Sequence, residues 1–310
     1  MGHILKIQPV FKEMIWGGHK LRDIYGYDIP SDQTGECWAI SGHKNGDCII
    51  GDGEYQGKSV AWLFENHREL FGDVEGNQFP LLVKIIDAKN DLSVQVHPND
   101  EYAAVHENGS LGKTECWYIL DCKEDANIVI GHHAKDKKEL ADMIHEGRWN
   151  ELIRTIPIKK GDFFQINPGC LHAIKGGTLL IETQQSSDIT YRVYDYDRLS
   201  NGKPRELHVQ QSIDCIEAPH HDYDGKITVE NEGDLTKTTL VKCDFYTLEK
   251  WDVAGKYKFT MDKPFMNVSV INGEGEINGS KITKGDHFII PSGIGECKIS
   301  GDLTVMASYL

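Results

Sequence analysis

Residues Leu92 to Trp117 read LSVQVHPNDEYAAVHENGSLGKTECW, and this stretch decides the fold that we predict for the chain. LSVQVH alternates apolar and polar residues as a strand does, so Gln95 and His97 share one face. A second alternating run, KTECW, places Lys113 and Glu115 on one face in the same way. Two strands therefore offer an amide, an imidazole, an ammonium and a carboxylate to one interior.

A third segment, GDFFQINPGCLHAI, ends one strand at Pro168-Gly169 and begins the next with His172. Together with the preceding Gln-x-His strand, this order resembles the cupin barrels, in which two short motifs meet at one metal ion. The resemblance implies a ligand set of oxygen and nitrogen atoms without thiolate, which suits a borderline divalent ion in an open catalytic site. The residues in that set are Gln95, His97, Glu115 and His172. Without a metal, they would be four buried polar groups in need of other partners.

Taken together, four segments resemble the type I mannose-6-phosphate isomerases in their short bacterial form: LSVQVHPND, GKTECW, PGCLHAI and TQQSSDITYRVYDYDR. The resemblance extends from Trp16-Gly17-Gly18 to beyond KPRELH at residues 203–208. It implies a zinc-dependent aldose-ketose isomerase that interconverts mannose 6-phosphate and fructose 6-phosphate through an enediol intermediate, with one Zn²⁺ per chain. Each motif is weak alone, but the set is specific.

The resemblance also implies roles for individual residues. Arg192 matches the family's catalytic arginine, Lys113 matches a lysine of the pocket, and Trp16 would lie at the rim of the sugar pocket. Ser93 shares the face of Gln95 and is a candidate phosphate contact, and a guanidinium suits phosphate geometry. Counting by two places Asp188, Thr190 and Arg192 on one face, which favours a charged pocket that binds substrate through Asp188.

The group that moves the proton between C1 and C2 of the sugar is the least defined part of the prediction. Glu182, Asp188, a Glu115 that leaves the metal and a water on the zinc ion are all chemically able, because burial can bring a carboxyl pKa near neutral. We prefer Glu182. In a pocket with little water, Lys113 and Arg192 would stabilise an oxyanion far better than in bulk water.

Composition limits the partners of the chain. The 310 residues include 48 acidic and 33 basic ones, for a formal charge of −15, so the surface as a whole disfavours nucleic acid and anionic lipid. A phosphorylated substrate therefore requires a local basic pocket.

No apolar run is long enough to span a membrane, and the N-terminal sequence lacks the order of a signal peptide. We expect a cytoplasmic protein with eight scattered, reduced cysteines, and the oligomeric state is left open.

The predicted fold is mainly β. A cupin (jelly-roll-like) barrel spans residues 1–235 and carries a small helical insertion, with helices near 59–71 and 136–153, where Ser59 and Asp136 are suitable N-caps. Residues 236–310 form a second, degenerate cupin-like β domain. Its turns have cupin spacing, but Glu296 stands where a ligand histidine is expected, so we predict that it binds no metal. An acidic, turn-rich stretch, residues 217–236, reads as a linker or long loop.

Three further features of the sequence can be explained by the fold alone, without a role in catalysis. Residues 36–41 and 48–50 look like paired strands of the barrel wall without a chemical role. Lys84 interrupts the apolar run FPLLVKIIDAK, either as a buried paired lysine or as one that extends to water from a strand end. The pairs His132-His133 and His220-His221 are expected in exposed loops.

Two other classes of function remain as alternatives. Metal-dependent cupin oxygenases usually use iron or manganese with more histidines, and a non-catalytic sugar-binding cupin would need no intact ligand set. Because Lys113 and Arg192 would flank the metal, an anionic sugar is favoured over dioxygen.

Overall fold

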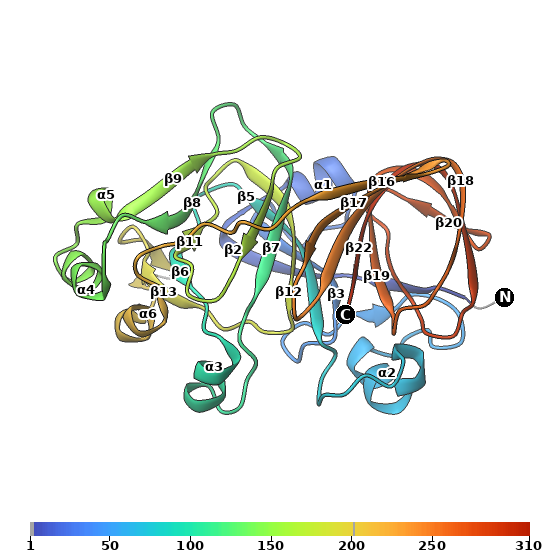
Figure 1. Ribbon diagram of the computed structural model, residues 1–310, viewed down its shortest axis with the longest axis horizontal. Helices are drawn as coiled ribbons and strands as arrows, with labels where there is room; N and C mark the ends of the chain where they lie inside the picture. The colour runs from blue at the N-terminus through green and yellow to red at the C-terminus, as the bar shows by residue number, and fades with distance from the viewer. Residues whose placement is uncertain (1–2, 201) are drawn as a thin grey trace.

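The computed structural model describes residues 3–200 and 202–310, and its architecture is mainly β, as predicted. Two lobes lie side by side in Figure 1, one with β5 to β13 and the other with β16 to β22. The sheets are open and face one another, rather than closing into barrels. Each lobe therefore encloses its core between facing strands.

Two sheets make up the first lobe. One has six strands in the order β10-β7-β12-β5-β2-β3, and the other has five in the order β13-β6-β11-β8-β9. The six strands are β10 (Phe163–Ile166), β7 (Glu115–Cys122), β12 (Thr178–Gln185), β5 (Leu81–Ala88), β2 (Val10–Gly18) and β3 (Thr34–Ser41). The five strands are β13 (Tyr191–Tyr194), β6 (Val94–Val96), β11 (His172–Ala173), β8 (Asn127–His132) and β9 (Ile153–Pro157).

A nine-stranded antiparallel sheet forms the second lobe and also recruits two strands from the start of the chain. Its strands are β16 (Thr228–Glu232), β17 (Leu235–Lys242), β18 (Thr247–Thr260), β19 (Met266–Ile277), β20 (Ser280–Thr283), β21 (His287–Ile290), β22 (Glu296–Tyr309), β1 (Leu5–Gln8) and β4 (Ile49–Ile50). A small hairpin, β14 (Leu199–Ser200) with β15 (Lys203–Pro204), stands apart.

Short helices cover the outside of the sheets. They are α1 (Lys20–Tyr25), α2 (Val60–Asn66), the 3₁₀ helix η1 (Arg68–Phe71), α3 (Asp100–His106), α4 (Lys137–His145), α5 (Trp149–Leu152) and α6 (Val209–Cys215). Both predicted helical regions are confirmed, each broken into two pieces. Ser59 Oγ accepts from the Trp62 N–H and Asp136 from the Glu139 N–H, as the N-cap predictions require.

Two local predictions were wrong. Residues 36–41 do not pair with residues 48–50, because β3 lies beside β2 and β5 while β4 crosses to the other lobe and pairs with β1. Residues 217–236 are not entirely a loop, because β16 and β17 form a hairpin at the edge of the nine-stranded sheet. The polar composition of β16 is explained by its position: all five of its residues are exposed.

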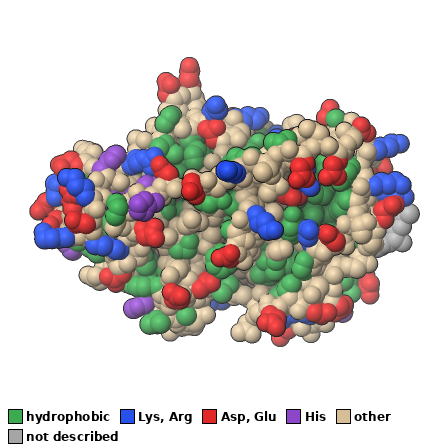
Figure 2. Space-filling model, in the orientation of Figure 1, with side chains coloured by type: hydrophobic (Ala, Val, Ile, Leu, Met, Phe, Trp, Pro, Cys, Tyr) green, Lys and Arg blue, Asp and Glu red, His purple; other side chains and the backbone are tan. Residues whose placement is uncertain are grey.

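The second lobe has a hydrophobic core of its own, formed by residues such as Trp251, Val268 and Phe288. Glu296, at the position of the expected ligand histidine, lies exposed on β22. Acidic and basic side chains are interspersed over the face shown in Figure 2. Among the described residues, every helix is too short to cross a membrane.

Candidate metal centre and substrate cavity

The five-stranded sheet brings together three polar residues that are distant in sequence. Gln95 on β6 lies directly opposite His172 on β11, and on its other side it lies opposite Arg192 on β13. Since directly opposed residues point to the same side of a sheet, these side chains form one row. His97 follows at the end of β6 and continues the polar face of that strand.

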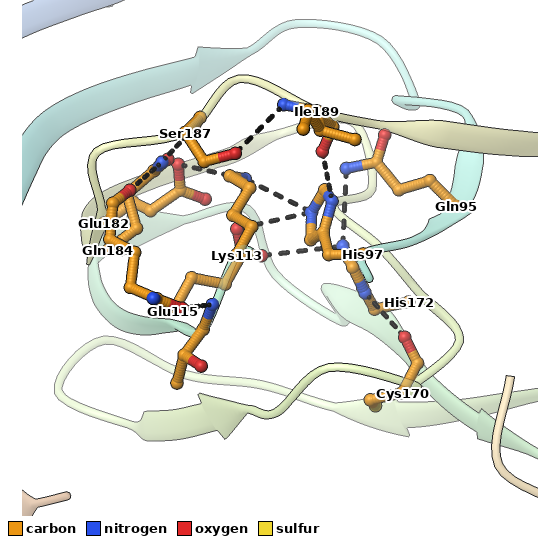
Figure 3. Close-up of polar contacts among 12 residues, drawn as sticks. Gln95, His97, Lys113, Glu115, Cys170, His172, Glu182, Gln184, Ser187 and Ile189 are labelled. Atoms are coloured by element: carbon orange, nitrogen blue, oxygen red, sulfur yellow. Dashed lines mark hydrogen bonds and ion pairs between the residues drawn. The ribbon is translucent and has the colours of Figure 1, made fainter. Parts of the chain in front are cut away.

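Ligand atoms of His97, Glu115 and His172 lie within 4.8 Å of one another, and all three residues are buried. One oxygen of Glu115 is 3.4 Å from His97 Nε2, and the other is 3.5 Å from His172 Nε2 (Figure 3). Two imidazole nitrogens and a carboxylate thus converge on one point. The sequence prediction that these residues lie together is confirmed.

Both histidines are oriented through their second ring nitrogen. His97 Nδ1 donates to the Ile189 carbonyl at 2.8 Å, and His172 Nδ1 donates to the Cys170 carbonyl at 2.9 Å. These bonds place the proton on Nδ1 and leave each Nε2 unprotonated, which is how protein metal ligands are commonly held. Burial and the Lys113 ammonium lower the pKa of His97 to about 3, and burial lowers that of His172. Both rings are therefore neutral at physiological pH, as metal ligands must be.

Glu115 carries the negative charge of this cluster. Burial alone would raise its pKa, but Lys113 and the two histidines outweigh this effect and hold the pKa well below its usual range. Its buried Oε1 has no hydrogen-bond partner among the described residues. A buried carboxylate oxygen without a partner is costly unless something else binds it. The donor set of two nitrogens and a carboxylate oxygen fits Zn²⁺.

Lys113 and Gln95 complete the surroundings of this point. The Lys113 ammonium donates to Glu115 and lies 3.2 Å from His97 Nε2. The ligand atoms of the cluster therefore surround a positively charged group in this structure. The Gln95 amide nitrogen lies 3.3 Å from His172 Nε2. Rotating this amide by half a turn would place Oε1 there instead, as a fourth metal ligand beside the atoms of His97, Glu115 and His172.

The six-stranded sheet faces this cluster with a second row of polar residues. Trp38 on β3 lies opposite Lys84 on β5, Lys84 opposite Glu182 on β12, and Glu182 opposite Trp117 on β7. The Lys84 ammonium is 3.5 Å from Glu182 and 3.9 Å from Glu36. Lys84 is therefore a buried, paired lysine, and the alternative that it extends to water is wrong.

An indole N–H fixes each of the two carboxylates beside Lys84. Trp117 donates to Glu182 at 2.9 Å, and Trp38 donates to Glu36 at 2.6 Å. Burial and the charge of Glu115 raise the pKa of Glu182, and its second oxygen has no hydrogen bond among the described residues. Burial opposes a charge on Lys84, but Glu36, Glu182 and Glu115 together raise its pKa.

A cavity lies between the two rows and is rich in basic groups, as a phosphorylated substrate requires. Its charged and polar lining residues are Glu36, Lys84, Ser93, Gln95, Lys113, Glu182, Thr190, Arg192 and Arg205. Trp16 and Met14 form part of its apolar wall. The predicted residues Trp16, Ser93, Gln95, Lys113, Glu182 and Arg192 thus meet around one space.

Arginines gather at the side of the cavity formed by β13. Arg192 Nε donates to Ser93 Oγ at 3.3 Å, and its Nη1 donates to the Glu206 carbonyl at 2.9 Å. Arg205 is held in a bidentate pair by Asp195, at 2.7 and 2.6 Å. Burial lowers the pKa of Arg192, and the charge of Arg205 lowers it further. Such crowding of cations favours the binding of an anion.

Asp188 is the predicted site residue that the structure places elsewhere. It lies in the segment before β13, where the alternation assumed from the sequence does not hold, and it does not line the cavity. Its side chain is 37% exposed, accepts from the Asn45 amide at 2.5 Å and lies 3.6 Å from His43.

Sequence reasoning missed the contributions of Glu36 and Arg205. Glu36 was assigned to a wall without chemistry, yet it lines the cavity beside Lys84. The available signal was a charged residue at an inward position of an otherwise buried strand, ECWAIS. Arg205 lies in the KPRELH motif and carried no signal of its own.

His132 was expected in a loop, but it is buried in β8 and donates from Nε2 to the Glu217 carbonyl at 2.7 Å.

The chain matches known proteins over its whole length. Residues 4–156 match the family described as phosphomannose isomerase type I, catalytic domain, and residues 236–310 match mannose-6-phosphate isomerase, cupin domain. The chain is 51% identical to mannose-6-phosphate isomerase ManA of Bacillus subtilis (strain 168), covering 99% of this chain and 98% of the relative. It is 46% identical to a mannose-6-phosphate isomerase of Streptococcus mutans, covering 100% and 99%.

Solved structures give the same result at the level of the fold. The crystal structure of mannose 6-phosphate isomerase from Bacillus subtilis superposes with a TM-score of 0.98 at 48% identity, covering 100% of both chains. A variant of phosphomannose isomerase from Salmonella typhimurium reaches a TM-score of 0.82 at 14% identity, covering 99% of both chains. At that low identity the second likeness concerns the fold alone.

Proposed function

The chain belongs to the type I phosphomannose isomerase family, and from this premise we propose that it interconverts mannose 6-phosphate and fructose 6-phosphate with the help of one Zn²⁺. The observation that carries the proposal is the cluster of His97, Glu115 and His172, whose neighbours Gln95 and Lys113 line a cavity together with the buried carboxylate of Glu182 and two arginines. Isomerisation of a sugar phosphate between aldose and ketose needs three functions: a centre that stabilises an oxyanion, a group that carries the proton and groups that bind the phosphate.

Four residues would hold the zinc ion: His97, His172 and Glu115 directly, and Gln95 through its amide oxygen. When bound, the ion would supply Lewis-acid stabilisation of negative charge on the sugar oxygens. The fit rests on the two neutral, oriented imidazoles and on the unpaired Oε1 of Glu115. Lys113, in contact with Glu115, would contribute a second positive charge on the same side of the substrate.

Glu182 is the proton carrier that the surroundings favour. It lines the cavity, and its Oε1 has no hydrogen bond among the described residues. Its pKa is raised, and a general base works best when its pKa lies near the working pH. Trp117 fixes the orientation of the other oxygen. Lys84, 3.5 Å from Oε1, would balance the charge as the carboxyl takes up and returns the proton. The reaction would pass through an enediol of the open-chain sugar.

The arginine side of the cavity would bind the phosphate. Arg192 and Ser93 are already hydrogen-bonded to each other and present polar groups to the same space. Arg205, oriented by Asp195, adds a second guanidinium. A phosphate placed here would relieve the repulsion between the two cations.

Neither alternative class of function explains the site as well. The relatives that match the whole chain are named as isomerases, which favours isomerase over oxygenase chemistry. A binding protein without catalysis would gain nothing from a buried carboxylate of raised pKa beside the substrate cavity.

A direct assay tests this proposal. Purified protein is incubated separately with mannose 6-phosphate and with mannose, and the ketose formed in each case, fructose 6-phosphate or fructose, is measured. We expect rapid product formation from mannose 6-phosphate and none from mannose, because mannose lacks the phosphate group. Failure to convert mannose 6-phosphate in protein that contains zinc would refute the proposal.

A further inference from the structure

A second cavity, of about 400 Å³, lies where the two lobes meet, and it shares no lining residue with the catalytic cavity. One wall comes from α1, β7 and β12, and the other from β18, β19, β22 and the turn between β20 and β21. Figure 1 shows β7 and β12 next to the strands of the second lobe. Its lining residues are Ile24, Tyr25, Tyr118, Leu120, Asp121, Lys160, Leu179, Lys250, Asp252, Ile271, Asn272, Lys284 and Thr304.

One sheet separates this cavity from the active site. On β7, Trp117 packs into the core next to the metal cluster, whereas Tyr118 packs against the core on the opposite face. On β12, Glu182 faces the catalytic cavity and Leu179 faces the new one. Consecutive strand residues point to opposite sides, so the two cavities lie back to back.

The charges in this junction cavity do not balance. Lys250 is paired with Asp252 at 2.7 Å, and Asp121 is paired with Lys20 at 3.0 Å. Across residues 3–200 and 202–310, no carboxylate oxygen lies within 4.0 Å of the ammonium of Lys160 or Lys284. Three lysines and two aspartates line the cavity, and Lys20, from outside it, pairs with Asp121, so Lys160 and Lys284 remain without a paired carboxylate among the described residues of a chain whose formal charge is −15.

The two unpaired lysines act on each other. Burial lowers the pKa of Lys284 and the charge of Lys160 lowers it further, while Asp121 on the same cavity wall opposes this with a smaller effect. The Lys284 ammonium also lies 5.0 Å from the centre of the Tyr25 ring, which places it over an aromatic wall of the cavity. Lys160 is exposed and Lys284 is half-buried, so an anion bound between them would offset their mutual repulsion and the partial loss of solvent around Lys284.

We propose that the junction cavity binds a small phosphate monoester, with Lys160 and Lys284 on the phosphate group and the walls of Tyr25 and Tyr118 beside the rest of the molecule. Two ammonium groups match the double negative charge of a phosphate monoester. The cavity is larger than a bare phosphate needs, and ligand sites are frequent at junctions between domains. Because its walls come from both lobes, a bound anion would hold the lobes together.

Calorimetric titration with inorganic phosphate tests this site, with chloride at matched ionic strength as the reference. The catalytic cavity must first be disabled, so the parent protein carries Ser93→Ala and Arg192→Ala. We expect this parent still to bind one phosphate per chain. Adding Lys160→Gln and Lys284→Gln should weaken that binding by about tenfold per lysine, because each removes a charged hydrogen-bond donor.

A matched control carries Lys226→Gln and Lys242→Gln, which remove the same charge from two exposed lysines elsewhere. It should bind phosphate as the parent does. Equal binding by the junction variant and this control would overturn the proposal, and so would a parent that binds no phosphate. The junction variant in the wild-type background should still convert mannose 6-phosphate, so this result is independent of the isomerase assay.

Discussion

Glu182 owes its expected reactivity to three neighbours: the indole of Trp117, the ammonium of Lys84 and the charge of Glu115. Glu182→Gln keeps the size of the side chain and an acceptor for Trp117 but cannot take up a proton. We expect kcat to fall by about 10²- to 10⁴-fold, with the metal content unchanged. Steady-state kinetics and elemental analysis of the same sample measure both.

Asp188→Asn is the matched control, because Asp188 was another acidic candidate and lies outside the cavity. It should keep nearly full activity. If Asp188→Asn lost the activity and Glu182→Gln kept it, the proton carrier would have been assigned to the wrong carboxylate.

Arg192 combines contact with Ser93 and a place on the cavity wall, so its loss should affect both binding and rate. For Arg192→Ala we expect kcat/KM to fall by about 10²- to 10³-fold, the range for removing a group that stabilises developing charge. Arg192→Lys should recover only part of it, because an ammonium lacks the bidentate fork. Arg148→Ala, which removes an arginine of the surface, serves as control. Equal activity of Arg192→Ala and Arg148→Ala would contradict this role.

At the scale of single residues, the sequence predicted the ligand cluster better than the charges around it. Gln-x-His, Glu115 and His172 carry spacing that indicates a shared site. Asp188 was misplaced because counting by two assumes a regular strand, and β13 begins only at Tyr191. Glu36 and Arg205 could not be assigned, since their contacts with Lys84 and Asp195 join strands or segments that no local pattern connects.

At the scale of elements, strands β3, β5 and β12 place Lys84 between the carboxylates of Glu36 and Glu182. Lys84→Met would leave Glu36 and Glu182 buried without their shared counter-charge. We expect the free energy of unfolding to fall by about 3 to 5 kcal/mol, the usual cost of removing one partner from a buried ion pair. Urea denaturation measures this loss.

Lys138→Met provides the comparison, because Lys138 forms an exposed ion pair with Asp142. Its loss should leave the free energy of unfolding nearly unchanged, because solvent and salt screen an exposed ion pair. A Lys84→Met protein as stable as the Lys138→Met protein would mean that the row does not depend on this charge.

His287 on β21 joins the two lobes at a buried position. Its Nε2 lies 2.7 Å from the Tyr27 hydroxyl, and its Nδ1 lies 2.9 Å from Ser269 Oγ. Burial lowers its pKa to about 3 in the folded protein, compared with about 6.5 in an unfolded chain. The unfolded state therefore binds the proton more readily, and stability falls as pH decreases from about 6.5 towards 3, by up to about 1.4 kcal/mol per pH unit.

His287→Gln isolates this contribution, because other buried groups titrate equally in both proteins. We expect the variant to be less stable than the wild type at pH 8 and the difference to shrink as the pH falls below 6.5. Denaturation curves at several pH values give the comparison. A difference that stays constant from pH 8 to pH 4 would exclude His287 as a source of the pH dependence.

The predicted elements failed where the chain passes between sheets. Ser59 and Asp136 capped helices as expected, because capping depends on a few consecutive residues. The pairing of β4 with β1 instead of β3 depends on the arrangement of both lobes, which local turn residues do not encode. Helix α3 was missed although Asn99 caps it, since Pro98-Asn99-Asp100 was interpreted only as the end of a strand.

At the scale of the whole molecule, the mainly β architecture and the family were predicted from the resemblance of motifs across most of the chain to a known family. The division into residues 1–235 and 236–310 stays a prediction. β1 and β4 from the start of the chain complete the sheet of the second lobe, and β16 adds residues 228–232 to it. The acidic composition requires a local basic pocket if the substrate is phosphorylated, and Lys84, Lys113, Arg192 and Arg205 gather around one cavity.

The central claim is that His97, Glu115 and His172 hold a zinc ion that the isomerase needs. Zinc is removed with a chelator, the absence of metal is checked by elemental analysis, and Zn²⁺ is returned stepwise while mannose 6-phosphate conversion is measured. We predict that activity is lost with the metal, returns in proportion to added zinc and reaches its plateau at one zinc per chain, and that His97→Ala shows no such return. Full activity in protein shown to be free of metal would contradict the account.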